Sequence, residues 1–293
     1  MIDTQRPLLR WLTLAGLTAL LAAVLVALAP RPDVGGDRQD ASAPVEAPTR
    51  HLMVHEGDLI IKQAGTIVDS LDIRGFVRVE APNVTISNSI IRGRATMEDA
   101  ILLWAGSGKS AGLEVIDTEI APTHHSPRTH GVYGYDFTLT GVDIHHVIDA
   151  VHIFGDNVTI TDSRLHDHLH YINDPTRGGR PSHDDGIQIQ QGRNIRITDN
   201  ELSDAYNAAI QITQDRGAVS SVTISGNRLS GGGCTVNVAE KDHGPVRGLT
   251  ISDNAFGTSR FDCDILLPPT TNAETAGNRS LGSDTVRVER RAQ

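Results

Sequence analysis

The feature that most constrains this 293-residue chain is a short pattern that recurs along it. An apolar–Thr–apolar strand is followed by a polar pair around Asn or Asp and then by another apolar residue, as at residues 158–165 (VTITDSRL). Copies begin at residues 84, 113, 137, 158, 195, 222 and 249, with spacings of 29, 24, 21, 37, 27 and 27 residues. Self-similarity at such a period indicates a repeat architecture.

A second short strand precedes each copy from residue 113 onward. Both strands alternate apolar and polar residues as half-buried strands do, and no unit contains a segment of helical length. A unit of ~20–30 residues built from short strands is one coil of a parallel β-helix, which buries its inward side chains only by stacking on its neighbours. The second strands are residues 100–103, 131–133, 150–153, 186–189, 209–212 and 235–238.

Four asparagines share one position of the later repeats: Asn200, Asn227, Asn254 and Asn278. Stacked Asn side chains can hydrogen-bond up and down a solenoid and satisfy buried turn amides. A run of ordinary surface turns is the alternative, but the shared register favours a ladder.

Over roughly residues 58–285, these repeated strands resemble the right-handed parallel β-helix proteins of the pectate-lyase-like superfamily. The resemblance implies an all-β fold, a right-handed parallel β-helix (solenoid), which we predict for residues 51–293. It leaves the reaction open, because that superfamily includes lyases, hydrolases, epimerases, phage tailspikes and proteins without activity.

The two cysteines, Cys234 and Cys263, begin equivalent strands 29 residues apart. The register therefore predicts that they stack one coil apart, at the ~4.8 Å spacing of paired strands. That spacing is within reach of a disulfide, which a location outside the cytoplasm permits. Two buried free thiols are the alternative.

The N-terminus carries the signature of an export signal. Residues 11–29 form an uncharged, almost wholly apolar run preceded by Arg6 and Arg10. Such a run is long for a signal peptide and just long enough to span a bilayer. We expect residues 1–30 to be a signal peptide or membrane anchor and residues 31–50, rich in Pro, Ala, Gly and Asp, to be a flexible linker. The body is then exported, either anchored facing outside the cytoplasm or secreted.

The composition limits the classes of partner that this chain can bind. The formal net charge is −10 and there are only three lysines, which excludes a basic nucleic-acid-binding surface. We expect a monomer whose partners are a polysaccharide and, through the N-terminal segment, a membrane, with no nucleic acid.

Histidine and aspartate gather in the middle of the chain, where ten of the thirteen histidines lie between residues 124 and 183. Stacked coils would turn equivalent repeat positions into columns on one face. The position just before the second strand carries Asp99, His130, Asp149 and Asp185 on successive coils. The outward position of the same strand carries Tyr133, His152, Gln188, Gln211 and Asn237.

The longest spacing, 37 residues, inserts a loop just before the coil that opens with His183-Asp184-Asp185. Insertions in solenoids cluster on one face, often the binding face. We therefore expect a single site. Its predicted catalytic residues are Asp149, Asp184, Asp185, His130, His152 and His183, and its predicted substrate-binding residues are Tyr133, Arg177, Arg180, Gln188, Gln211 and Tyr171.

Acid/base cleavage of a polysaccharide is the first hypothesis. Carboxylates on neighbouring coils would lie ~5–10 Å apart, as in glycoside hydrolases, and like charges so close leave one acid and one base. Residues 184–187 and 148–151 are similar to the paired-Asp and single-Asp motifs of polygalacturonase-type hydrolases. However, the two motifs lie 35 residues apart, farther than in that family, and residues 207–209 (NAA) replace its Gly-His-Gly. These departures argue against that particular activity.

A lyase or an epimerase would use the same face differently. β-Elimination from a uronic acid needs a cation for the carboxylate and a base for the C5 proton. Asp149 and Asp185 would hold Ca²⁺, the one candidate cofactor, and Arg177 or Arg180 would face the carboxylate. The proton would be moved by His152, His183 or Tyr133. The Asp-Pro-His signature of epimerases with this fold is absent.

Two other classes remain open. One is a non-catalytic cell-envelope protein that binds glycan or has a structural role. The other is a metal-binding protein, because His166, His168 and His170 would share one face of a strand and suit Zn²⁺ or Cu²⁺, whereas in a polar loop they would simply be solvated. We favour an extracytoplasmic carbohydrate-active enzyme, a polysaccharide lyase or glycoside hydrolase, because the acidic column, the histidines and the inserted loop converge on the same coils.

Overall fold

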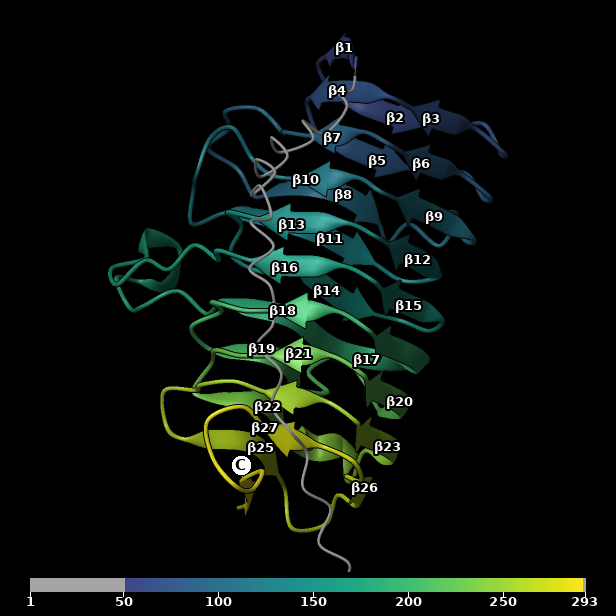
Figure 1. Ribbon diagram of the computed structural model, residues 1–293. Coiled ribbons are helices and arrows are strands. Elements are labelled where there is room, and N and C mark those ends of the chain that lie inside the picture. Colours follow the sequence, from purple (N-terminus) through teal and green to yellow (C-terminus); the bar gives the residue numbers. More distant parts are fainter. Residues whose placement is uncertain (1–50, 292–293) are drawn as a thin grey trace, which may run out of the picture. The chain divides into compact units, whose positions relative to one another are not determined.

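The computed structural model describes residues 51–291, which form a stack of parallel strands (Figure 1). The predicted signal or anchor at residues 1–30 and the predicted linker at residues 31–50 lie outside the described residues. Within the described part of the chain, no helix is long and apolar enough to cross a membrane. Helical structure there is confined to two short 3₁₀ turns, η1 (Pro175–Arg177) and η2 (Lys241–His243).

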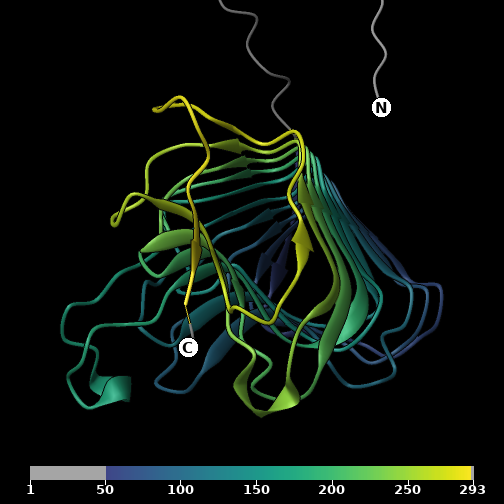
Figure 2. The same ribbon diagram turned by 90° about the horizontal axis from the view of Figure 1, so that it is seen from below.

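Viewed along the stack, the strands form three walls (Figure 2), which we call sheets A, B and C. Each coil contributes one strand to each sheet, and the strand pairs within the sheets are parallel.

Sheet A has ten short strands. They are β1 (Met53–Glu56), β4 (Leu71–Arg74), β7 (Ile90–Ile91), β10 (Glu119–Ile120), β13 (Asp143–His145), β16 (Arg164–His166), β18 (Glu201–Leu202), β21 (Arg228–Leu229), β24 (Ala255–Phe256) and β27 (Arg279–Ser280).

Sheet B contains the predicted second strands. Its members are β2 (Leu59–Ile61), β5 (Val77–Val79), β8 (Ala100–Ala105), β11 (Thr129–Gly134), β14 (Val151–Phe154), the first part of β17 (Asp185–Thr198), β19 (Ala208–Ile212), β22 (Cys234–Val238), β25 (Cys263–Leu267) and β28 (Val288–Arg290).

Sheet C contains the apolar–Thr–apolar strands. Its members are β3 (Ile67–Asp69), β6 (Thr85–Ser87), β9 (Leu113–Ile116), β12 (Phe137–Thr140), β15 (Val158–Thr161), the last part of β17, β20 (Val219–Ser225), β23 (Arg247–Ser252) and β26 (Ala273–Glu274).

The apolar repeat positions stack into columns inside the coils. In sheet C, one such column is fully buried along its whole length, while the Thr residues between the apolar positions face outward. Its members are Ile86, Val115, Leu139, Ile160, Ile197, Ile224 and Ile251. Burial by stacking is thus the main stabilising contribution, and the all-β parallel solenoid is confirmed.

The predicted asparagine ladder is present inside the turns. The backbone N–H and side-chain amide of Asn200 both donate to Asn227 Oδ1, at 2.9 and 3.0 Å, and Asn227 donates to Asn254 in the same way. Asn254 in turn donates to Asn278. The ladder continues on the earlier coil through Ser163, whose N–H donates to Asn200 Oδ1. Each rung satisfies buried amides that have no strand partner.

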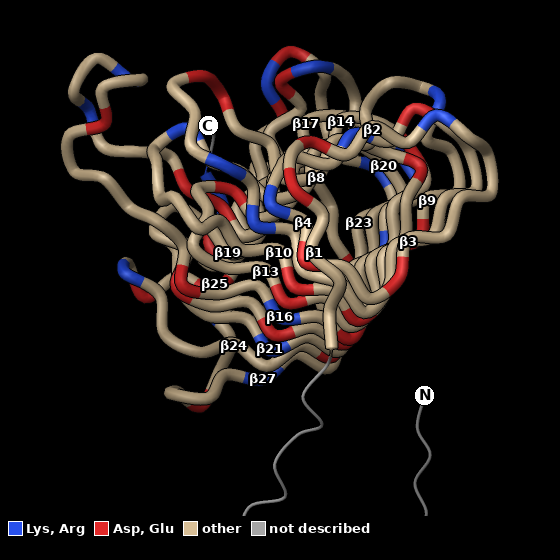
Figure 3. The backbone as a smooth tube through the Cα atoms, turned by 90° about the horizontal axis from the view of Figure 1, so that it is seen from above, with Lys and Arg blue, Asp and Glu red and all other residues tan. Residues whose placement is uncertain are grey.

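The third strand of each coil was not predicted. Most strands of sheet A have only two or three residues and are too short to show an alternating pattern. In the sequence they are visible only as the apolar residue that ends each repeat. Outward positions of this sheet carry charges of both signs, seen along β10, β13, β16 and β21 in Figure 3. Successive coils there place Glu119, Asp143, Arg164, Glu201 and Arg228 in register.

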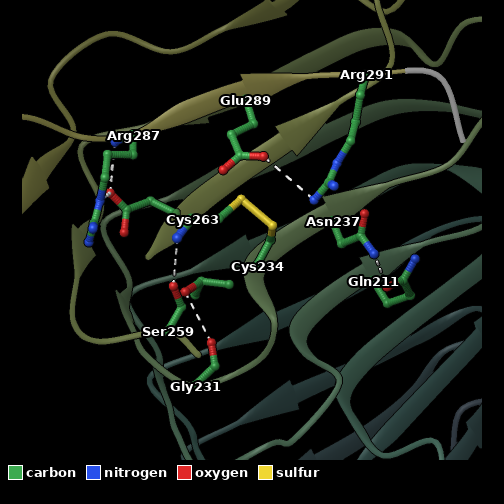
Figure 4. The surroundings of a disulfide bond; sticks show 11 residues. Gln211, Gly231, Cys234, Asn237, Ser259, Cys263, Arg287, Glu289 and Arg291 are labelled. Carbon is green, nitrogen blue, oxygen red and sulfur yellow. Dashed lines mark hydrogen bonds and ion pairs between the residues drawn. A yellow bond between two sulfur atoms is a disulfide. The ribbon is translucent and has the colours of Figure 1, made fainter. Parts of the chain in front are cut away.

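The predicted disulfide joins Cys234 in β22 to Cys263 in β25, whose Cα atoms lie 4.6 Å apart (Figure 4). It links two coils near the C-terminal end of the stack. Asn237, on the same strand as Cys234, donates a hydrogen bond of 2.8 Å to Gln211 on the preceding coil, so the outward column of sheet B runs beside the bridge.

The insertion leaves the stack between β16 and β17 as a protruding loop that carries η1 (Figure 1). An antiparallel bridge between Asp174 and Arg180 closes it. The Asp174 carboxylate accepts hydrogen bonds of 2.7 Å from both the backbone and the hydroxyl of Thr176. The loop therefore has internal structure and returns to sheet B immediately before Asp185.

Candidate functional site

The outward face of sheet B carries the predicted column of polar and aromatic side chains. Strand pairing places one residue of each coil in register along this face, and the stretch from Trp104 to Asn237 is polar or aromatic throughout. Between them the column contains Tyr133, His152, Gln188 and Gln211. The repeat register is therefore sufficient to bring these residues together.

A second column lies two to three residues earlier on the same strands. The His130 ring Nδ1 is 3.2 Å from Asp149 Oδ2, and the backbone N–H of Asp185 donates to Asp149 Oδ1 at 3.0 Å. The prediction that Asp99 extends this column is wrong, because Ala100 pairs with Thr129 and Ile101 with His130. Asp99 instead forms an ion pair with Arg128 at 3.1 Å, two positions away from the column.

Asp149 is buried, with 5% of its surface exposed. Burial by itself would raise its pKa, but contact with His130, the charge of His152 and the amide of Asp185 outweigh burial and lower it. The Tyr133 hydroxyl also lies 3.5 Å from Asp149 Oδ2. Asp149 is therefore the group on this face that holds its negative charge.

Asp185 is completely buried, and burial raises its pKa to about 6. The neighbouring Asp149 charge acts in the same direction, while His183 and Asn207 oppose it. The His183 ring lies 3.1 Å from Asp185 Oδ2, off the ideal hydrogen-bond direction, and Asn207 donates to Asp185 Oδ1 at 2.6 Å. The two stacked carboxyl groups thus differ in protonation, one an acid and one a carboxylate.

His152, a member of the outward column, lies close to Asp149, with its ring Nδ1 3.9 Å from Asp149 Oδ2. Only 8% of its surface is exposed. Neither ring nitrogen makes a well-aligned hydrogen bond. Burial lowers its pKa to about 4, so the ring is neutral near neutral pH. Tyr133 contacts its edge at a centroid distance of 4.4 Å, and burial raises the pKa of the Tyr133 hydroxyl well above its usual value.

Asp184 is placed elsewhere, although it was predicted to be catalytic. Its fully buried carboxylate lies 2.7 Å from the His170 ring and accepts hydrogen bonds from Ser182 Oγ at 3.1 Å and from the Tyr206 backbone at 2.7 Å. Neighbouring residues of an extended chain point to opposite sides, so Asp184 and Asp185 cannot both face sheet B. Asp184 anchors the insertion to the stack.

The three histidines suggested as metal ligands do not share a face. His166 contacts Asp143 and Asp167, at 2.8 and 2.7 Å, on the side of sheet A. His168 faces the carbonyl of Ile148 at 3.2 Å, and His170 contacts Asp184. They diverge because the chain leaves the sheet after His166 instead of continuing as a strand. Within residues 51–291, no group of three or more His, Cys, Asp or Glu residues is arranged to hold a metal ion.

The other substrate-binding candidates lie in the insertion. Arg177 is in η1. Contact with Asp185 raises the pKa of His183, and the positive charge of Arg177 opposes this rise. Arg180 is exposed where the insertion closes, and Tyr171 is half-buried near its base. Arg177 is thus within electrostatic reach of the site, whereas Arg180 and Tyr171 make contacts within the insertion.

Several residues near the site were not predicted from the sequence. A cavity of about 580 Å³ lies at the end of β14 and is lined by residues that include Tyr135, Phe154, Gln191 and Arg216. The pairing of β14 with β17 shifts register between Ile153 and Phe154, which is a bulge of the kind that re-aims side chains near sites. The sequence feature that could have indicated this region is the scarcity of aromatic residues. Of the eleven Phe, Trp and Tyr residues, five lie on or beside this face. They are Phe76, Trp104, Tyr133, Tyr135 and Phe154.

Comparison with known proteins agrees with this architecture. A family model described as "Right handed beta helix region" matches residues 149–280, a span that holds Asp149, His152 and Asp185. A search of curated proteins finds no match for the chain. Together with the three parallel sheets, this match supports a right-handed parallel β-helix fold for the described residues.

Proposed function

We propose that this protein is a carbohydrate-active enzyme that cleaves a polysaccharide by acid/base chemistry on the outer face of sheet B. One observation carries the proposal: Asp149 and Asp185 lie on adjacent coils, and their pKa values are shifted in opposite directions. Pairs of carboxyl groups tuned apart in this way supply the acid and the base of glycoside hydrolysis.

In this proposal Asp185 is the source of the proton, because its raised pKa keeps it protonated up to about pH 6. Since Asp185 is enclosed, the proton reaches the leaving glycosidic oxygen through the partly exposed His183 ring, which lies 3.1 Å from Asp185 Oδ2. Asp149 supplies the carboxylate that acts as base or nucleophile. Asn207, which donates to Asp185 Oδ1, orients the acid. The neutral ring of His152, whose nitrogens make no well-aligned hydrogen bond, then binds a sugar hydroxyl, while the Tyr133 hydroxyl donates to Asp149.

A second candidate reaction, β-elimination from a uronic-acid polymer, is favoured by His152. An unprotonated imidazole without a well-aligned partner inside the site is a suitable base for a C5 proton. This reaction also needs a cation beside the uronate carboxylate.

We also propose that the protein works outside the cytoplasm, held there or delivered there by the apolar segment at residues 11–29. The Cys234–Cys263 disulfide supports this location, because disulfides persist in oxidising compartments.

The test is to incubate the full chain, purified in mild detergent, with neutral and acidic polysaccharides in the presence of Ca²⁺, near pH 5.5. New reducing ends and the absorbance of unsaturated uronates are followed together. Reducing ends alone identify a hydrolase, and reducing ends with absorbance identify a lyase. Activity should decline as the pH rises through about 6, where Asp185 ionises.

Asp185→Asn and Asp149→Asn should each lower the rate by roughly a hundredfold or more. The matched control is Arg228→Ala on sheet A, which should retain the full rate. If no polysaccharide is cleaved, the proposal fails in favour of a glycan-binding or structural β-helix. Equal rates in the two Asp variants and the wild type would also contradict it.

A further inference from the structure

The cavity lined by Phe154 and Arg216 opens at the C-terminal ends of β11 and β14, where sheet B gives way to sheet C. Phe154, the last residue of β14, lines the cavity two residues after His152. Asp149 and Phe154 are five residues apart along an extended chain, or ~16 Å. A glycan lying across sheet B would therefore place one sugar at the carboxyl pair and another sugar, several units farther along the polymer, in the cavity.

Arg216 is held over this cavity by a firmly anchored loop between β19 and β20. The buried Gln214 side chain donates to the carbonyls of Glu240 and Gly244, at 2.8 and 2.7 Å, and accepts from the backbone of Val219 at 2.7 Å. The backbone N–H of Arg216 donates to the Gln190 carbonyl at 3.1 Å.

The guanidinium of Arg216 stacks on the ring of Phe154, with Cζ 4.7 Å from the ring centroid. On another side of that ring lies Gly106, where an added Cβ would collide with Phe154. A stacked guanidinium keeps the N–H groups along its edge available for a planar anion. The arrangement thus presents an immobilised fork of donors at the cavity.

Arg216 shares the lining of the cavity with two aspartates, Asp136 and Asp156. Within residues 51–291 it forms no ion pair, whereas Asp156 in the same cavity is paired with Arg193 at 3.0 Å. The other acidic residue of the lining, Asp136, accepts a hydrogen bond of 2.8 Å from Asn157. The charge of Arg216 reaches the reaction site, because it helps to lower the pKa of His152.

Resting on the proposed function, we propose that this cavity is a glycan subsite in which Arg216 binds an anionic substituent of the polysaccharide. The ligand chemistry is a planar or tetrahedral oxyanion on the sugar, either a carboxylate or a sulfate, held by paired N–H donors. Arg216 is then a specificity-determining residue that selects an acidic glycan, in place of Arg177 and Arg180 of the insertion.

The experiment measures binding without turnover, in full-chain protein carrying Asp185→Asn and Trp11→Phe. Trp104, whose ring centroid is 5.8 Å from that of Phe154, is then the only tryptophan and reports ligand by fluorescence. Three probes are titrated: oligogalacturonate, the same oligomer with its carboxyl groups reduced to alcohols, and an O-sulfated galactan oligomer. The variants are Arg216→Ala, Arg216→Lys and the control Arg228→Ala.

Arg216→Ala should weaken binding of a charged probe by about tenfold to a hundredfold, the effect of losing a charge-assisted pair of hydrogen bonds, and leave the neutral probe unaffected. Arg216→Lys should retain part of the affinity, since it keeps the charge and loses the stacked fork. The probe that responds distinguishes carboxylate from sulfate.

Equal losses for charged and neutral probes, no loss in Arg216→Ala, or no binding of any probe would overturn the inference. The two proposals fail separately. A protein that binds a charged oligomer through Arg216 but cleaves nothing retains the subsite and loses the proposed enzyme. If the protein cleaves a neutral polysaccharide and Arg216→Ala does so at the same rate, the proposed enzymatic activity stands and the proposed Arg216 subsite is wrong.

Discussion

At the scale of single residues, the chemistry depends on how differently two stacked aspartates are surrounded. Asp149 receives a backbone amide and two imidazoles, whereas Asp185 is wholly enclosed and receives one amide and one imidazole. The same residue type therefore has its pKa lowered in one place and raised in the other. Composition cannot show this difference, because it arises from burial and neighbours.

A test of this difference needs no substrate. The raised pKa of Asp185 means that the folded chain holds this proton more tightly than the unfolded chain, whose value is near 3.8. The resulting stabilisation is full below that value and is lost as the pH rises through about 6. The Asp185→Asn variant cannot ionise at this position and does not lose this stabilisation. As the pH rises, the difference in free energy of unfolding between the variant and the wild type should therefore change in favour of the variant, by on the order of 3 kcal/mol.

Thermal denaturation at about pH 4 and about pH 7.5 measures this gain. Asp99→Asn is the control, because Asp99 is exposed outside the column and should show no such trend. A difference between Asp185→Asn and the wild type that stays constant with pH would contradict the assigned environment.

At the scale of elements, the coils are joined by hydrogen-bonded ladders as well as by apolar columns. Asn227 accepts two hydrogen bonds from Asn200 and donates to the Ile197 carbonyl and to Asn254. The turn between sheets C and A is buried at this point, so no water replaces a lost partner. The Asn residues therefore fix the spacing of the coils that carry the site.

We expect Asn227→Ala to lower the free energy of unfolding by roughly 3 kcal/mol, because it leaves buried donors of Asn200 and the Ile197 carbonyl without partners. Asn278→Ala, at the partly exposed end of the ladder, is the matched control and should cost less. Denaturant unfolding measures both variants. Equal losses would show that the ladder has no special role.

At the scale of the whole molecule, a solenoid is stabilised by contacts between neighbouring coils and has no closed core, so its ends open first. The Cys234–Cys263 disulfide joins two coils close to the C-terminal end, whereas the carboxyl pair lies near the middle of the stack. The disulfide thus protects the end that would otherwise open toward the site.

Replacing both cysteines by serine should lower the free energy of unfolding by about 3 kcal/mol, the expected effect for a loop of this length. Hydrogen exchange should increase in β25 and β28 and remain slow in β11 and β14. Exchange that increases evenly along the stack would contradict opening from the end.

The sequence by itself determined the fold and the columns. A repeat that buries one side chain in two fixes the register of each coil on the next, so the outward column from Tyr133 to Asn237, the asparagine ladder and the disulfide all follow from spacing. Only the tertiary structure decided what leaves that register: Asp184 turned toward the insertion, the three histidines separated, and Phe154 and Arg216 brought together across a bulge. Loops and bulges do not repeat, so their side chains are positioned by contacts between segments that lie far apart in the chain.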